Sequence, residues 1–186
     1  MKLAAQKGKQ PNTGSTVVSR YDYPLLFEPG TSFVYGASID WVGQLVERLS
    51  GLTLDAYIKK NIAEPLGITS ITFFPNEDPA VKAKIPGLVM RSPEGQLMAT
   101  DFSINSTNKE AFGGQGSYAS LSDYIKVQRS ILANDGKLLK PETVDELMFK
   151  PSLTPESVQG LTEFMRSPMK AVMIGELYVS FMTKFI

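Results

Sequence analysis

The 186-residue sequence contains no cysteine and no histidine. Without cysteine the chain forms no disulfide bond, performs no thiol catalysis and offers no thiolate ligand to a metal. Without histidine it holds neither a Ser-His-Asp triad nor a His-Glu-x-x-His zinc site. The sequence also has no Asp-x-Asp-x-Asp-Gly run of the kind that binds calcium. We therefore expect no metal and no cofactor.

Neither an excess of charge nor a long apolar run is present. Lysine and arginine number 19, as do aspartate and glutamate, so the formal net charge is zero. This balance offers no basic surface for nucleic acid or an anionic membrane. No stretch approaches the roughly 20 apolar residues of a membrane-spanning helix. We expect a soluble, cytoplasmic chain without a nucleic-acid or membrane partner.

The pattern along the chain predicts a helix-rich α+β architecture with few strands. Residues 1–20 are polar and rich in turn-forming residues, and the helical periodicity weakens after Pro151. In the first helix, with Ser38 as the predicted N-cap and Gly51 as the stop, a row of apolar residues is expected to face the core. That row is Ile39, Val42, Leu45, Val46 and Leu49. Further helices are predicted from Thr53 to Gly67, from Ser120 to Asn134 and from Pro141 to Met148, and strands at 68–74, 88–90 and 97–102.

The most informative segment runs from Phe27 to Ser38. Pro29-Gly30 predicts a turn, the aromatic residues after it predict a short strand, and Tyr35 stands just before the first helix. One interpretation makes Tyr35 a half-buried structural aromatic. The other makes it a catalytic residue, because a tyrosine is one of the few groups left in this chain that could carry a proton.

A catalytic tyrosine needs particular neighbours. A free phenol titrates near pH ~10, so it acts as a base near neutrality only when an ammonium group lies beside it. The chemistry therefore predicts a tyrosine–lysine pair with a serine nucleophile between them. We assign Tyr35 as the candidate catalytic residue, and Gly36, Ser38 and Trp41 as candidate substrate-binding residues. Trp41 is also a candidate for the hydrophobic core.

The stretch Tyr35-Gly36-Ala37-Ser38-Ile39-Asp40-Trp41, which follows Phe27-Glu28-Pro29-Gly30, resembles the serine β-lactamase and penicillin-binding-protein superfamily. In detail it is similar to the class C-like esterase and transesterase branch, which includes fungal acyltransferases of the lovastatin type. The similarity continues through Glu64-Pro65-Leu66-Gly67, Gly113-Gly114 and Leu138 to Val144. It implies a partial β-lactamase/transpeptidase-like fold, mostly its helical lobe, and acyl transfer or hydrolysis of a small-molecule ester or thioester.

Two features depart from this family pattern. The family's Ser-x-x-Lys motif lies far N-terminal to its tyrosine, but no such string precedes Tyr35. The two strings present, Ser106 to Lys109 and Ser167 to Lys170, are not expected to supply the nucleophile. Class C β-lactamases place asparagine two residues after the tyrosine, where this chain has Ala37, which favours the esterase branch.

These features define the functional hypotheses. The first is a β-lactamase-related serine hydrolase or transesterase whose chain is inactive alone, because it lacks the nucleophile motif. The alternative is a non-catalytic remnant or binding module derived from the same fold. We divide the sequence into a polar N-terminal segment (1–20), a partial family domain (21–155) and a C-terminal segment unlike the family (156–186). Helices whose apolar faces lack a sheet to cover them predict low solubility or self-association.

Overall fold

A computed structural model describes residues 13–100, 105, 107–148 and 153–166. The chain divides into two compact units. The larger unit comprises Met1–Tyr23 and Ala37–Val144, and the smaller comprises Pro24–Gly36 and Asp145–Ile186. Within the described ranges, no helix is long and apolar enough to cross a membrane.

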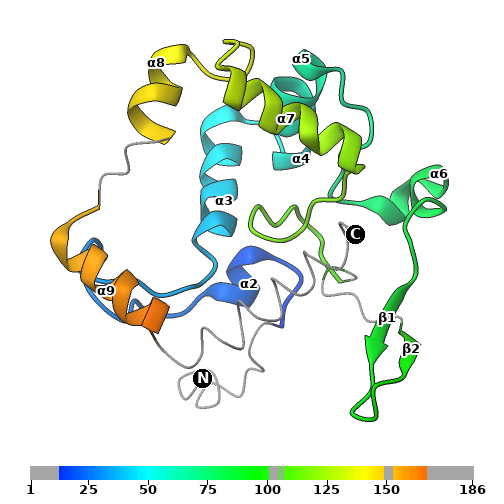
Figure 1. Ribbon diagram of the computed structural model, residues 1–186, viewed down its shortest axis with the longest axis horizontal. Helices are drawn as coiled ribbons and strands as arrows, with labels where there is room; N and C mark the ends of the chain where they lie inside the picture. Colours follow the sequence, from blue (N-terminus) through cyan, green and yellow to red (C-terminus); the bar gives the residue numbers. More distant parts are fainter. Residues whose placement is uncertain (1–12, 101–104, 106, 149–152, 167–186) are drawn as a thin grey trace. The chain divides into compact units, whose positions relative to one another are not determined.

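Helices dominate the described residues, and two short strands form a single hairpin (Figure 1). The helix-rich α+β class expected from the sequence is confirmed. The α-helices are α2 (Val17–Tyr21), α3 (Ser38–Ser50), α4 (Leu54–Ile58), α5 (Glu64–Leu66), α6 (Pro79–Lys82), α7 (Leu121–Ala133), α8 (Pro141–Thr143) and α9 (Pro155–Arg166). The other elements are the π-helical turns η1 (Lys59–Ala63) and η3 (Val144–Met148), the 3-10 turn η2 (Pro75–Glu77), and strands β1 (Leu88–Arg91) and β2 (Leu97–Thr100).

Local capping chemistry fixes most helix ends where the sequence predicts them. The Thr53 side chain accepts a hydrogen bond from the backbone N–H of Ala56 at the start of α4, and Ser120 accepts one from Asp123 at the start of α7. Gly51 ends α3 in the left-handed conformation with φ 71°. The prediction of Ser38 as the N-cap of α3 is wrong. Ala37 is the N-cap residue, and its carbonyl accepts from the N–H groups of both Asp40 and Trp41.

The hydrophobic core of the larger unit is small. It is built around Leu54, Phe73 and Ala111, with partly buried apolar neighbours packed against it. Phe112 is fully buried beside this group, with the Arg20 guanidinium carbon 4.2 Å from its ring centroid. Arg20 also donates hydrogen bonds to the carbonyl of Gly14 and the side chain of Asn108. The N-terminal helix α2 is thus held to the loop that precedes α7.

Helix α3 places its polar and small residues against the unit and its apolar residues outward. Asp40 is only 3% exposed, and its carboxylate accepts a hydrogen bond from the Gly114 N–H at 2.9 Å. Glu47 likewise accepts from the Leu54 N–H at 2.7 Å. The expectation that the apolar row faces the core is therefore wrong in this unit. Ile39, Val42, Leu45, Leu49 and Trp41 are exposed, while Val46 is partly buried.

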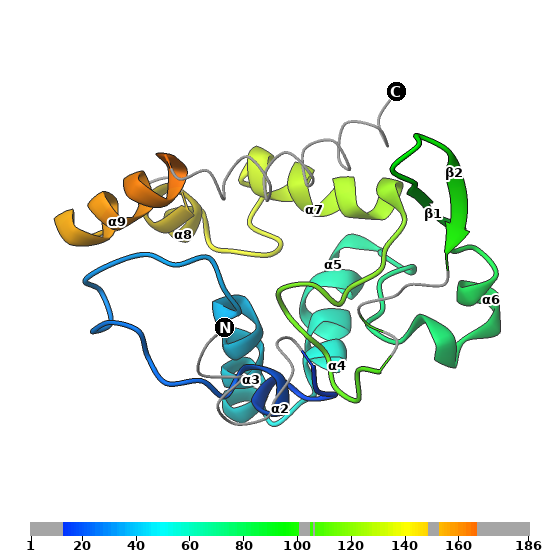
Figure 2. The ribbon, with the colours of Figure 1, turned by 90° about the horizontal axis from the view of Figure 1, so that it is seen from below.

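Helix α7, like α3, buries polar residues. It lies beside α4 and α5 (Figures 1 and 2). Its buried residues are Asp123 and Ser130, with Val127 and Ile131 partly buried, whereas Leu121, Tyr124, Ile125 and Leu132 are exposed. The Asp123 carboxylate accepts hydrogen bonds from the Ser70 hydroxyl at 2.8 Å and from the N–H groups of Ser70 and Thr69. It also pairs with the Lys126 ammonium at 2.7 Å. One carboxylate thus joins the start of α7 to the loop that follows α5.

The strands are short, as the sequence predicts. β1 and β2 pair antiparallel with Leu88 opposite Thr100, and their side chains are almost all exposed. The predicted strand at 68–74 is reduced to one bridge, in which Thr72 and Tyr118 exchange both backbone hydrogen bonds. Without further pairing partners among the described residues, this segment forms no ladder.

The Asp123 carboxylate is expected to make the chain sensitive to acid. Hydrogen bonding to Lys126, then to the Ser70 hydroxyl, holds the pKa of Asp123 far below its ordinary value, against an opposing effect of desolvation. A carboxylate whose folded-state pKa is depressed stabilises the fold above its unfolded pKa of about 3.9, and this stabilisation is lost as pH falls further. Urea titrations between pH 7 and pH 3 should show declining stability below about pH 4.

In Asp123→Asn the acid-dependent part of this decline should be smaller, and the stability at pH 7 lower. Glu64→Gln, at an exposed carboxylate of α5, is the matched control and should keep the wild-type profile. An Asp123→Asn profile parallel to the wild type would contradict the assignment.

Candidate functional site

The segment carrying Tyr35 lies in the smaller unit, where it packs against α9. The predicted Pro-Gly turn is confirmed, since Gly30 has φ 85° and the Thr31 N–H donates to the Glu28 carbonyl at 3.1 Å. The predicted short strand after this turn is wrong, because residues 31–35 are extended but pair with no strand in the described part of the chain. Helix α9 supplies their contacts instead.

Two hydroxyl groups attach the start of α9 to the Pro-Gly turn. Thr154 and Ser157 both donate to the Gly30 carbonyl, at 2.6 and 2.9 Å. Thr154 also accepts a hydrogen bond from the Ser157 N–H at the helix start. One carbonyl oxygen of the turn therefore accepts both hydrogen bonds that join the turn to the start of α9.

The Tyr35 ring is stacked, and its exposed fraction is 55%. It lies parallel to the Phe164 ring of α9, with centroids 6.2 Å apart and an interplanar angle of 9°. Phe33 contacts the same Phe164 ring edge-on at 5.4 Å. Within the described residues, no hydrogen bond or ion pair joins the Tyr35 hydroxyl to another group. Its ring is thus supported on one side while its hydroxyl is accessible.

The four predicted site residues fall into two groups. Tyr35 and Gly36 belong to the smaller unit, whereas Ser38 and Trp41 are in the first turn of α3 in the larger unit. Ser38 is exposed on that turn, and Trp41 is partly exposed and so is not a buried core residue. The roles of Tyr35, Gly36, Ser38 and Trp41 in catalysis and substrate binding remain predictions.

Sequence reasoning missed Phe164 and the helix that carries it. Residues 155–166 were expected to have only weak helical periodicity, yet they form the twelve-residue helix α9. The signal was present in Thr154 followed by Pro155, because threonine is a good N-cap and proline suits the first helical turn.

Two small pockets lie in the larger unit. One of about 150 Å³ is lined by Phe73, Phe74, Pro75, Asn76, Glu77, Asn105, Asn108 and Tyr118. Small-molecule sites usually enclose about 300–1,000 Å³. None of the four predicted site residues lines it, so it is not the predicted substrate site.

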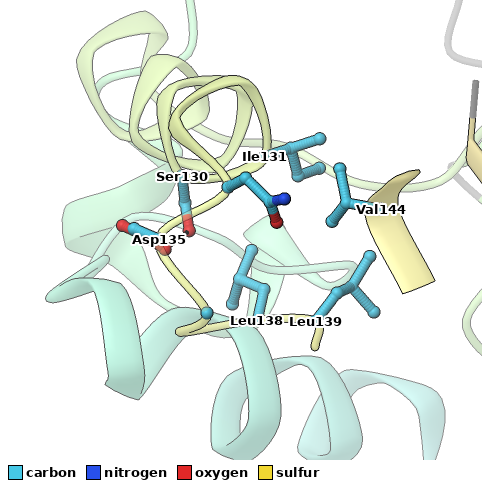
Figure 3. A pocket seen from close by; sticks show the side chains of 8 residues that line it. Ser130, Ile131, Asp135, Leu138, Leu139 and Val144 are labelled. Atoms are coloured by element: carbon cyan, nitrogen blue, oxygen red, sulfur yellow. Dashed lines mark hydrogen bonds between the residues drawn. The ribbon is translucent and has the colours of Figure 1, made fainter. Parts of the chain in front are cut away.

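Another pocket lies where α7 ends, and it has essentially no free volume (Figure 3). Leu138, Leu139 and Val144 close it on one side. On the other side the Ser130 hydroxyl donates to the Asp135 carboxylate at 2.6 Å, and this bond lowers the pKa of Asp135. The pocket is a packed helix end that holds the turn after α7. Among the described residues, no group of three or more carboxylates could hold a metal ion.

The α9 contact gives a test of how Tyr35 is held. A Cβ added at Gly160 would lie 2.6 Å from the Phe33 nitrogen and 2.7 Å from the Ser32 hydroxyl oxygen. Alanine favours an isolated helix by about 1 kcal/mol over glycine, so helix propensity alone predicts that Gly160→Ala stabilises α9. Because the Cβ has no room, we expect the opposite result, with faster amide hydrogen exchange at residues 31–36.

Gln159→Ala is the control, since Gln159 is exposed on the same helix. It should leave the exchange rates at 31–36 unchanged. Unchanged or slower exchange in Gly160→Ala would show that the helix does not approach Phe33 this closely.

Comparison with known proteins finds fungal acyltransferases and esterases among the proteins that this chain is similar to. A sequence model of the family described as Beta-lactamase matches residues 7–176. Monacolin J acid methylbutanoyltransferase of Aspergillus terreus is 40% identical over 151 residues, which cover 80% of this chain and 36% of that protein. Lovastatin esterase of Penicillium rubens is 37% identical over 172 residues, which cover 90% of this chain and 43% of that protein.

A solved structure gives the same result. A mutant of simvastatin synthase from Aspergillus terreus superposes with a TM-score of 0.71 at 39% identity, covering 89% of this chain and 38% of that one. The present chain therefore spans less than half the length of each of these relatives. The partial fold and its helix-rich character, both expected from the resemblance, are confirmed.

Proposed function

We propose that this chain, which belongs to the β-lactamase family, contributes to an enzyme that transfers or hydrolyses the acyl group of a small-molecule ester or thioester. The observation that carries the proposal is its 37–40% identity to a fungal methylbutanoyltransferase and a fungal esterase. Both names describe breaking an ester or acyl bond, and the family relationship makes the same reaction class the best expectation here.

Tyr35 is the residue proposed to carry the proton. Its position just before α3 matches the tyrosine of the family pattern, and its ring rests on Phe164 with the edge open to solvent. With an ammonium group beside it to stabilise the phenolate, this side chain would take the proton from an attacking hydroxyl as a phenolate and return it to the leaving group as a phenol. Gly36, Ser38 and Trp41 are proposed to contact the substrate.

The nucleophile is proposed to lie outside this sequence. In the string from Ser106 to Lys109, Asn108 accepts a hydrogen bond from the buried Arg20, and the Lys109 N–H donates to the Ser15 carbonyl. These contacts anchor the loop to the N-terminal segment, a structural role. The string from Ser167 to Lys170 lies outside the described residues. We therefore expect the chain alone to be inactive.

Two measurements test this part of the proposal. Purified chain should hydrolyse p-nitrophenyl butyrate no faster than buffer, and a fluorophosphonate probe should label none of its serines. Intact-mass analysis with peptide mapping would detect labelling. A covalent adduct at any serine would overturn the expectation that the nucleophile lies elsewhere.

A chimera tests the activity itself. In the Aspergillus terreus methylbutanoyltransferase, the matched segment is replaced by the corresponding residues of this chain. The proposal expects the folded chimera to hydrolyse p-nitrophenyl esters and to react with the fluorophosphonate. A folded chimera with neither property would instead favour the alternative, a non-catalytic remnant or binding module. That alternative has the absence of Ser-x-x-Lys before Tyr35 in its favour.

A further inference from the structure

Helix α3 is amphipathic, but the side that it buries is the polar one. Its buried positions are Asp40 and Gly43, and both the Asp40 and Glu47 carboxylates hydrogen-bond to backbone N–H groups of the same unit. On the opposite side, Leu45 is 53% exposed and Leu49 78% exposed. A helix that packs only against this unit should show the reverse arrangement, with its apolar side inward.

Helix α7 repeats this arrangement independently. Asp123 and Ser130 are buried and make the hydrogen bonds described above, while the opposite side carries exposed apolar residues. In the following, the outward faces are the exposed apolar sides of α3 and α7. They consist of Ile39, Val42, Leu45 and Leu49 with Trp41 on α3, and of Leu121, Tyr124, Ile125 and Leu132 on α7.

Isolated exposed apolar residues are ordinary on protein surfaces, but contiguous apolar helix faces mark a contact site. Two features of the outward faces point to a buried interface. Neither face has a carboxylate among its apolar residues, and its polar members are the exposed Arg48, on the side of Trp41, and the uncharged Gln128 on α7. Each helix is already fixed on its other side by buried hydrogen-bonded polar groups. The helices therefore cannot rotate to bury their apolar sides without breaking those bonds.

The length of the relatives indicates what covers these faces. The chain matches 36% of the methylbutanoyltransferase and 38% of the simvastatin synthase mutant, so more than half of each relative lies outside the match. From this we infer that the outward faces of α3 and α7 form the interface with the portion of the β-lactamase-family fold that lies outside these 186 residues. The inference rests on family membership and not on the proposed acyl-transfer activity.

Two other occupants give different observable behaviour. A second copy of the chain on these faces would produce a defined dimer. If another segment of the chain itself covered these faces, substituting aspartate into either face would destabilise the isolated chain. If the portion of the fold outside this chain is the occupant, we expect neither a dimer nor this destabilisation. The outward faces of the isolated chain would then be exposed to water.

The test compares the same substitutions in the isolated chain and in the chimera described above. Leu45→Asp and Ile125→Asp each place a charge at the centre of one outward face. Gln96→Asp, which adds the same charge at an exposed polar position of the β1–β2 turn, is the control. In the isolated chain, all three variants should keep the wild-type melting temperature. In the chimera, the two face variants should lose the cooperative transition, while Gln96→Asp keeps it.

The sole tryptophan adds a second readout in the isolated chain. Trp41 belongs to the outward face of α3 and is exposed, so acrylamide should quench its fluorescence readily. A hydrophobic dye should bind the wild type and bind less to Leu45→Asp. These measurements need no activity, so they remain informative even if the proposed chemistry is wrong.

Several results would overturn the inference. A defined dimer that either face variant converts to a monomer would make a second copy the occupant. Destabilisation of the isolated chain by Leu45→Asp, or increased quenching of Trp41 after deletion of residues 167–186, would place the occupant within the chain. An unmodified chimera that fails to fold, or one that tolerates both face variants, would show that these faces do not contact the remaining fold.

Discussion

Replacing Phe112 with alanine is expected to lower the free energy of unfolding of the larger unit by about 3–5 kcal/mol, the usual cost for a buried phenylalanine. Its side chain is fully buried, contacts Tyr21 edge-on at 6.2 Å and carries the Arg20 guanidinium on its ring face. Truncation would leave a cavity and also remove the ring that faces a buried cation. Since small domains are stable by only about 5–15 kcal/mol, this loss would unfold a large fraction of the chain near body temperature.

Chemical denaturation followed by circular dichroism measures this effect. Leu132→Ala is the control, because it removes a similarly large apolar side chain that is 78% exposed. It should change the stability of the isolated chain by less than about 0.5 kcal/mol. Phe112→Leu should fall between the two. Equal effects of Phe112→Ala and Leu132→Ala would show that the small core does not hold this unit together.

The second large effect is expected on catalysis. In the active chimera, Tyr35→Phe should reduce the rate of ester hydrolysis by about 10²- to 10⁴-fold, the usual contribution of general acid–base catalysis. The substitution removes only the hydroxyl and keeps a ring that can stack on Phe164. The reduction should therefore appear in kcat, with little change in KM or melting temperature.

Tyr57→Phe is the control, since it removes a hydroxyl from a partly exposed tyrosine of α4 that belongs neither to the Tyr35 segment nor to the outward faces. Initial rates with p-nitrophenyl butyrate across a pH series provide the measurement. If Tyr35→Phe hydrolyses the ester as fast as the unsubstituted chimera, Tyr35 is a structural aromatic and the proton carrier must be sought elsewhere.

The helices could be predicted because their ends depend on short-range chemistry. A threonine or serine cap requires only residues within one turn of itself, as at Thr53 and Ser120, and the left-handed end at Gly51 is equally local. The two short strands were predicted at 88–90 and 97–102, whereas their antiparallel pairing as a hairpin was not predicted.

The direction that each helix faces could not be predicted in this way. Periodicity shows that Leu45 and Leu49 share a side of α3 but does not show which neighbour covers that side. The side of α3 that is buried depends on long-range contacts. One is the hydrogen bond that the Asp40 carboxylate accepts from the Gly114 N–H, 74 residues away in the sequence. The contact of Phe164 with Tyr35 spans an even longer stretch of sequence, so the environment of Tyr35 was also beyond local reasoning.

The β1–β2 hairpin has a consequence for how the protein would behave at high concentration. A ribbon of only two strands with exposed side chains on both faces is marginally stable in water, and each strand leaves one edge of backbone donors and acceptors unpaired in the described part of the chain. Such edges accept further strands from any extended polypeptide. Storage of the isolated chain therefore favours slow intermolecular β-sheet growth from residues 88–100, with the helices unchanged at first.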